Sequence, residues 1–89
     1  MEIHRGAQVI PRNLSITGGN EFFEGGGIKN LGWLALDNVA VTQNTAGNAG
    51  GGIATMSGAE LYLFDSTVSA NTAIGTTGTF QGGGGIYQG

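Results

Sequence analysis

The chain repeats itself at intervals of 25 and 27 residues, and this repeat limits its possible folds more than any other feature. Apolar residues and asparagine recur in one order, in segments that begin at Val9, Leu34 and Leu61. Three glycines followed by isoleucine recur with them, at 25–28, 50–53 and 83–86. A period of this size is typical of a solenoid, in which units that cannot fold alone stack around one continuous core.

Within each repeat the apolar residues alternate with small or polar ones over short runs. Leu34 and Leu36 lie on either side of Ala35, which is the spacing of a strand and not of a helix. Glycine makes up 19 of the 89 residues and opposes helix, because each glycine costs about 1 kcal/mol relative to alanine there. The sequence therefore predicts three short strands per repeat: one through Gly-Gly-Ile, one through Leu-x-Leu and one around Val-x-x-Asn.

Strands of successive repeats would pair in parallel and in register, which predicts an all-β fold of the parallel β-helix (β-solenoid) type. We expect a single domain over 1–89, with repeats at approximately 3–27, 28–52 and 53–85 and a further turn that begins at residue 86. This amounts to about three turns. Neither end resembles the polar capping unit that a solenoid needs, so we expect an uncapped fragment of a longer protein.

Stacking in register would turn equivalent positions into columns of side chains. Four apolar columns would form the core, namely Val9–Leu34–Leu61, Pro11–Leu36–Leu63, Ile16–Val41–Val68 and Ile3–Ile28–Ile53–Ile86. Two polar columns would form corners, namely Asn13–Asn38–Asp65 and Gly19–Asn44–Asn71. Asparagine tolerates left-handed backbone and can hydrogen-bond its stacked neighbour, so we interpret these columns as structural ladders and not as a row of metal or ligand sites.

Composition argues against several classes of function. The chain has no cysteine and a net charge of −3, and its three cations form no patch that would attract nucleic acid. No apolar run is long enough to span a membrane. The glycine runs lack the Gly-Lys-Ser/Thr of a phosphate-binding loop, because Lys29 follows Ile28 and precedes Asn30. We therefore expect no cofactor, no metal and no nucleic-acid partner.

The carboxylates do not form a catalytic constellation. Asp37 aligns with Arg12 and Asp65 aligns with Asn38, so the two aspartates occupy different columns. Enzymes that cleave glycosides need paired carboxylates about 5–9.5 Å apart. An Asp37–Asp65 pair across neighbouring turns has no base, arginine or histidine in the same turns, and Arg12, one turn earlier, is expected to form an ion pair with Asp37. No catalytic residue is therefore predicted.

Outward-facing aromatic residues are the one surface feature with potential for binding. Trp33, Tyr62 and Phe64 lie at positions that alternate with the core leucines, so their side chains should point away from the core. Exposed tryptophan and tyrosine on a flat face can stack on sugar rings or contact a protein partner. Neighbouring turns or flanking domains could instead cover them.

The repeat also resembles a known group of proteins. Asn44-Thr45-Ala46 before Gly50–Ile53, and Asn71-Thr72-Ala73 before Gly83–Ile86, are similar to the right-handed parallel β-helix repeats of bacterial surface proteins. The pattern resembles the passenger repeats of chlamydial polymorphic outer membrane proteins and of other adhesins. It departs from the chlamydial Phe-x-x-Asn, since valine stands at 41 and 68. The resemblance implies a right-handed coil, secretion to the cell surface and a stalk or adhesive role.

These observations predict a non-enzymatic structural or adhesive segment of a secreted or cell-surface bacterial protein. Its expected partner is a carbohydrate or a protein of the host or cell surface. The alternative is a fragment of a polysaccharide lyase or glycoside hydrolase, which flanking turns could complete beside Asp37 and Asp65. Ice binding would need a wide threonine array, whereas the column Thr17–Thr42–Ser69 is only one residue wide.

Overall fold

The computed structural model describes residues 1–22, 24–47, 50–74 and 85–89, and all regular structure in these ranges is β-strand. The strands are β1 (Glu2–Ile3), β2 (Gln8–Val9), β3 (Arg12–Thr17), β4 (Asn20–Glu21), β5 (Ile28–Asn30), β6 (Trp33–Thr42), β7 (Thr45–Ala46), β8 (Ile53–Thr55), β9 (Glu60–Phe64), β10 (Thr67–Ser69), β11 (Thr72–Ala73) and β12 (Ile86–Gln88).

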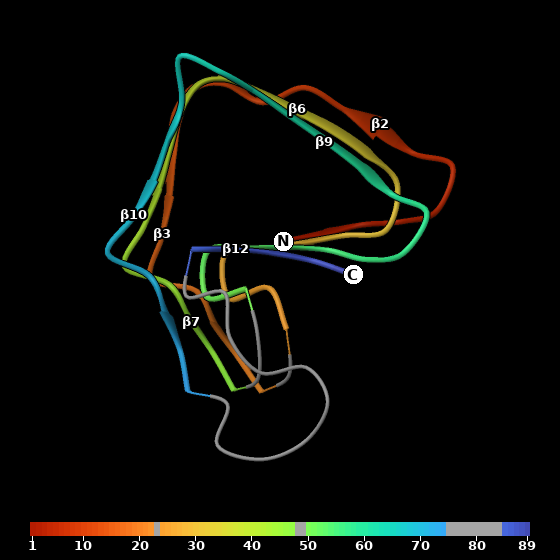
Figure 1. Ribbon diagram of the computed structural model, residues 1–89. Coiled ribbons are helices and arrows are strands. Elements are labelled where there is room, and N and C mark those ends of the chain that lie inside the picture. The colour runs from red at the N-terminus through yellow and green to blue at the C-terminus, as the bar shows by residue number, and fades with distance from the viewer. Residues whose placement is uncertain (23, 48–49, 75–84) are drawn as a thin grey trace.

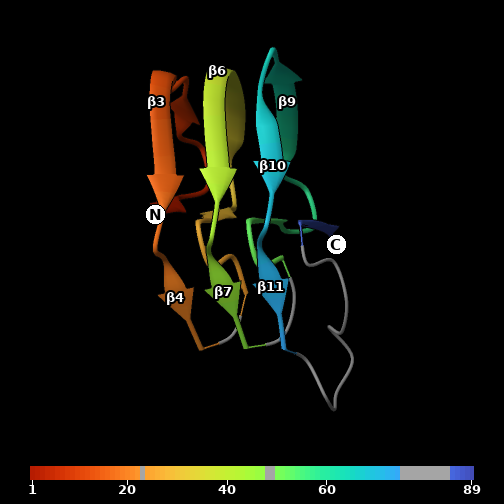
Figure 2. The same ribbon diagram turned by 90° about the vertical axis from the view of Figure 1, so that its left-hand side faces the viewer.

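Every strand pairing in the described part of the chain is parallel. One sheet has the order β1-β5-β8-β12, a second joins β2, β3, β9 and β10 to β6, and a third has the order β11-β7-β4. The chain visits the three sheets in turn, and we call each circuit a pass: β1–β4 form the first, β5–β7 the second and β8–β11 the third. Figure 1 looks along the stack, and Figure 2 shows equivalent strands of the passes side by side.

The second sheet is bent where the sequence predicts a corner. Asn13, Asn38 and Asp65 all have left-handed backbone, with φ of 55°, 55° and 49°. The bend lies within the continuous strand β6, so the Leu-x-Leu and Val segments belong to one sheet. The predicted separate strand at the Val position is found in the first and third passes, as β3 and β10. In the second pass β6 continues through the corner, and the third sheet begins after Asn44 with β7.

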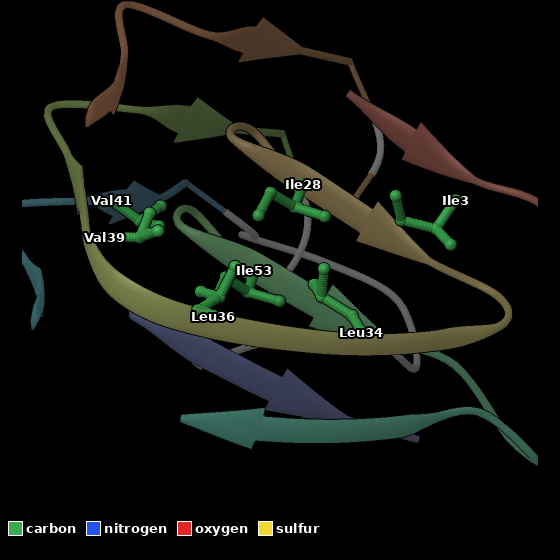
Figure 3. Packing of buried hydrophobic residues seen from close by; sticks show 7 residues of the cluster. All are labelled: Ile3, Ile28, Leu34, Leu36, Val39, Val41 and Ile53. Carbon is green, nitrogen blue, oxygen red and sulfur yellow. The ribbon is translucent and has the colours of Figure 1, made fainter. Parts of the chain in front are cut away.

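The predicted apolar columns form the core. Leu34 pairs with Val9 on one side and Leu61 on the other, and Val41 pairs in the same way with Ile16 and Val68. Figure 3 shows the side chains of the buried cluster within the ring of strands, namely Ile3, Ile28, Leu34, Leu36, Val39, Val41 and Ile53. Leu63 and Ile86, at the C-terminal end of the described stack, are 40% and 38% exposed.

Ile3 does not occupy the column predicted for it. It pairs with Asn30 instead of Ile28, which is a displacement of two residues along β5. Side chains alternate between the two faces of a strand, so a displacement of two keeps Ile3 directed inward, and it is 3% exposed. The remaining pairs of this column, Ile28 with Ile53 and Ile53 with Ile86, have the predicted register.

The two asparagine columns serve different purposes. In the outer column the side-chain amide of Asn38 donates a hydrogen bond of 2.9 Å to Oδ1 of Asn13. Asn44 and Asn71 also bond to each other as stacked neighbours, but Asn44 is buried and Asn71 is partly buried, and neither has left-handed backbone. Here the left-handed residues are the ones before them, Gln43 and Ala70, with φ of 57° and 54°. The sequence thus predicted this ladder correctly and placed the turn one residue too late.

Candidate functional site

The three aromatic residues lie on the outer side of the second sheet. Leu34 and Leu36 of β6 point into the core, so by alternation Trp33, which precedes Leu34, points outward, and Tyr62 and Phe64 do the same on β9. We call the surface formed by Trp33, Tyr62 and Phe64 the aromatic face. Tyr62 is 42% exposed and Phe64 is 56% exposed, while Trp33 is partly buried.

Trp33 and Tyr62 are diagonal neighbours on adjacent strands. Trp33 pairs with Glu60 and Ala35 pairs with Tyr62, so the two rings meet across the sheet. Their centroids are 5.4 Å apart and their planes are tilted by 40°. Aromatic pairs of this kind contribute about 0.5–1.5 kcal/mol beyond the area they bury. The contact fixes the indole ring at the edge of the aromatic face.

A hydrogen bond also holds the phenol of Tyr62. Its hydroxyl donates to Oε1 of Glu60 at 3.1 Å. This hydrogen bond, together with the negative charge of Glu60, raises the pKa of Tyr62 above its ordinary value of 10.0. The same carboxylate lies directly across from Trp33, because Glu60 and Trp33 are partners in the register.

Replacing Glu60 with glutamine is expected to bring the pKa of Tyr62 back towards its ordinary value of 10.0. The raised native pKa means that the pair stabilises the fold below about pH 10, and that this contribution is lost as the pH rises through the native pKa. The measurement is tyrosinate absorbance against pH, with Tyr62→Phe to separate the signal of Tyr62 from that of Tyr87. Identical titrations of the wild type and Glu60→Gln would show that the pair is not formed.

Asp37 and Asp65 occupy different places in the register, because Asp37 pairs with Phe64, the residue before Asp65. Asp37 lies across from Arg12, as expected, with 3.8 Å between Nε of Arg12 and Oδ2 of Asp37. Both side chains are well exposed, so this ion pair contributes little stability. Asp65 lies at the corner, where it lines a shallow hollow together with Asn13 and Asn38. The register therefore places a cation, and not a second carboxylate, beside Asp37.

The connections that lead into the second sheet differ in length. Four residues link β1 to β2, in a turn closed by a hydrogen bond of 3.1 Å from Ala7 N to the carbonyl of His4. The equivalent turn between β8 and β9 is closed by a bond of 3.0 Å from Ala59 N to the carbonyl of Met56. In the second pass only Leu31 and Gly32 connect β5 to β6. Figure 1 shows this yellow connection lying inside the red and green ones.

A hollow of about 340 Å³ lies at this short connection. Gly6 and Gly58 of the two longer turns line it, with φ of +80° and +86°, and Gly32 lines it from the short one. A side chain at Gly32 would collide with the backbone, since a Cβ there would lie 2.4 Å from the carbonyl oxygen of His4. We call this feature the saddle. It adjoins the aromatic face, because Trp33 also lines it.

Four side chains give the saddle its chemical character, namely Arg5, Gln8, Trp33 and Glu60. Trp33 lies in the register between Gln8 on one strand and Glu60 on the other. Arg5, Gln8 and Glu60 were not predicted from the sequence to be site residues. The sequence does contain a sign of the saddle, since the first repeat interval is 25 residues and the second is 27. The difference of two residues arises because the connection from β5 to β6 is two residues shorter than its counterparts.

A buried asparagine supports the short connection from inside. Asn30 is fully buried, and its Oδ1 accepts a hydrogen bond of 3.0 Å from Gly32 N. Its amide group donates a bond of 2.8 Å to the carbonyl of Glu60 in the next pass. Asn30 thereby joins the floor of the saddle to the strand that carries Glu60. In the sequence Asn30 lies between Lys29 and Leu31, and this context gives no sign of the role.

Other features of the described residues add no further chemistry. No group of three or more histidine, aspartate or glutamate side chains in the described ranges is placed to hold a metal ion. Those ranges also contain no helix with the length and apolar character needed to cross a membrane. His4 is exposed, with its Nδ1 3.7 Å from a carboxylate oxygen of Glu2.

Comparisons with known proteins give no relative from which a function can be transferred. No protein-family model matches the chain, and searches of curated proteins and of solved structures give no significant match. The aromatic face and the saddle are therefore the features from which a function can be inferred.

Proposed function

We propose that the chain is a segment of a right-handed parallel β-helix, with about three turns that correspond to the passes described above. The in-register pairing of Leu34 with Val9 and Leu61 supports this assignment. Connections between parallel strands of one sheet are right-handed in about 98% of cases. The path of the chain in Figure 1 also supports a right-handed coil, because it runs counter-clockwise from β2 to β3 while later passes lie nearer the viewer.

We further propose that this segment is a non-enzymatic, adhesive part of a secreted or cell-surface bacterial protein. The observation that carries the proposal is the aromatic face, which is held by a sheet whose strands pair residue for residue. Tyr62 projects from β9 next to the ring of Trp33, and Phe64 is exposed two residues further along the same strand, so the aromatic surface is preorganised. Such a surface suits the apolar face of a sugar ring or a protein partner. The resemblance to bacterial surface repeats supports the location.

A glycan array probed with the purified chain tests this function. We expect Trp33→Ala and Tyr62→Ala each to weaken binding about tenfold, because each removes a ring from the contact surface. Ile74→Ala is the matched control, since Ile74 is 60% exposed but follows β11, in a different sheet. Equal binding by the wild type and both aromatic variants would exclude the aromatic face. Release of oligosaccharides from polygalacturonate or alginate would instead support the lyase or hydrolase alternative.

A further inference from the structure

We propose that the saddle binds one ring of an uncharged sugar, with Trp33 as the stacking surface and Arg5, Gln8 and Glu60 as hydrogen-bonding partners. This inference rests on the proposed adhesive function and specifies both the ligand class and the place where it binds. The sugar would then bind at the edge of the aromatic face, beside Trp33, and not at its open part.

The shape of the saddle limits the size of the ligand. Its volume of about 340 Å³ lies at the lower end of the range of about 300–1,000 Å³ for small-molecule sites. The turns that contain Gly6 and Gly58 belong to the first and third passes, whereas the floor belongs to the second. The saddle therefore suits a single ring or a disaccharide better than an extended chain.

The lining groups match the hydroxyls of a sugar. Each hydroxyl both donates and accepts hydrogen bonds, while arginine only donates, a carboxylate only accepts and glutamine does both. Gln8 and Glu60 are the register partners of Trp33, so a ring stacked on the indole would have a polar group on each side. Tyr62 holds the carboxylate of Glu60, and Asn30 holds the backbone of the same residue.

The charges of the saddle favour an uncharged ligand. Arg12 and Lys29 each have a carboxylate within 4.0 Å, whereas no ion pair of Arg5 is found within the described residues. Arg5 thus contributes donors that no described carboxylate occupies. Glu60 supplies one negative charge in the same hollow, and it would repel the carboxylate of a uronate. The sum of the two charges is zero, which suits a neutral ring.

The test uses Trp33 as its own reporter, because it is the only tryptophan in the chain. Titration with galactose, glucose, N-acetylglucosamine and cellobiose is expected to change the tryptophan emission with saturation in the millimolar range, whereas galacturonate has a weaker effect. Arg5→Ala and Gln8→Ala are each expected to weaken binding about tenfold. Arg12→Ala is the matched control, because Arg12 lies on the same sheet but outside the saddle.

A second variant fills the saddle without removing any of its side chains. Insertion of Ser-Gly between Leu31 and Gly32 gives the second pass a connection as long as its neighbours, and we expect it to abolish the emission change. Circular dichroism like that of the wild type would show that the variant folds, and calorimetry on Arg5→Ala provides an independent readout if it does not.

The outcomes separate this inference from the function on which it rests. No saturable change with any neutral sugar, tighter binding of galacturonate, or wild-type binding by Arg5→Ala and Gln8→Ala would overturn the sugar site. If array binding still depended on Trp33 and Tyr62 in that case, the adhesive function would stand without it. If no neutral sugar bound in the saddle and array binding did not depend on Trp33 or Tyr62, both proposals would be overturned.

Discussion

Replacing Asn44 with alanine is expected to lower the free energy of unfolding by about 3 kcal/mol, because buried polar groups would lose their partners. Asn44 is 1% exposed, and its amide nitrogen lies 3.0 Å from the carbonyl of Thr42 and 3.1 Å from that of Ile16. Its Oδ1 accepts a bond of 2.8 Å from Gly19 N, and Oδ1 of Asn71 lies 2.9 Å from its amide. Alanine can replace none of these contacts.

Urea unfolding followed by Trp33 emission measures this effect, and Asn38→Ala is the matched control. Asn38 is exposed and, within the described part of the chain, its side-chain amide bonds only to Asn13. Its replacement should therefore cost about 1 kcal/mol, mainly from left-handed backbone. Equal losses in the two variants would show that the Asn44–Asn71 ladder contributes no more to stability than the Asn13–Asn38 ladder.

Replacing Gly27 with alanine is expected to cost about 2–3 kcal/mol through overpacking. A Cβ at this position would lie 2.7 Å from the carbonyl oxygen of Gly52 and 2.9 Å from the amide nitrogen of Asn44. The Gly52 oxygen belongs to the backbone, and the side-chain amide of Asn44 is held by its hydrogen bond to Asn71, so neither atom can easily move away. The added methyl group would therefore push the second and third passes apart.

Gly85 provides the control for this prediction, because its carbonyl accepts the hydrogen bond of 3.1 Å from Gly52 N in the same column. Among the described residues, a Cβ on Gly85 would meet only Cγ1 of Val68, at 3.7 Å, so Gly85→Ala should change stability by less than about 0.5 kcal/mol. Thermal or urea unfolding of both variants makes the comparison. A loss at Gly85 as large as that at Gly27 would contradict the close approach of the passes.

The core columns could be predicted because their information is local and repeated. Leu34 and Leu36 alternate with outward residues, and the same alternation returns at a nearly constant interval. Parallel strands that stack in register then bring equal positions together, as the pairing of Leu34 with Leu61 confirms. The same reasoning placed Trp33, Tyr62 and Phe64 on the outer side of the sheet.

The saddle could not be predicted from the pattern of the side chains. A repeat alignment shows that the interval changes by two residues, but it does not show which corner is shortened or what then lines it. That depends on how the turns with Gly6 and Gly58 stand on either side of Gly32. The same length difference explains why Ile3 was assigned to the wrong column. The second pass lacks two residues between the positions that correspond to Ile3 and Val9.

By itself the sequence determined the all-β class, the apolar columns and the outward position of the three aromatic residues, because alternation and period are properties of the chain alone. Only the tertiary structure decided that Asn44 lies inside, that the amide of Asn30 bonds to the backbone of Glu60, and that Arg5, Trp33 and Glu60 share one hollow. These features depend on contacts between residues 25 to 30 or more positions apart, whose geometry is fixed only when the passes stack.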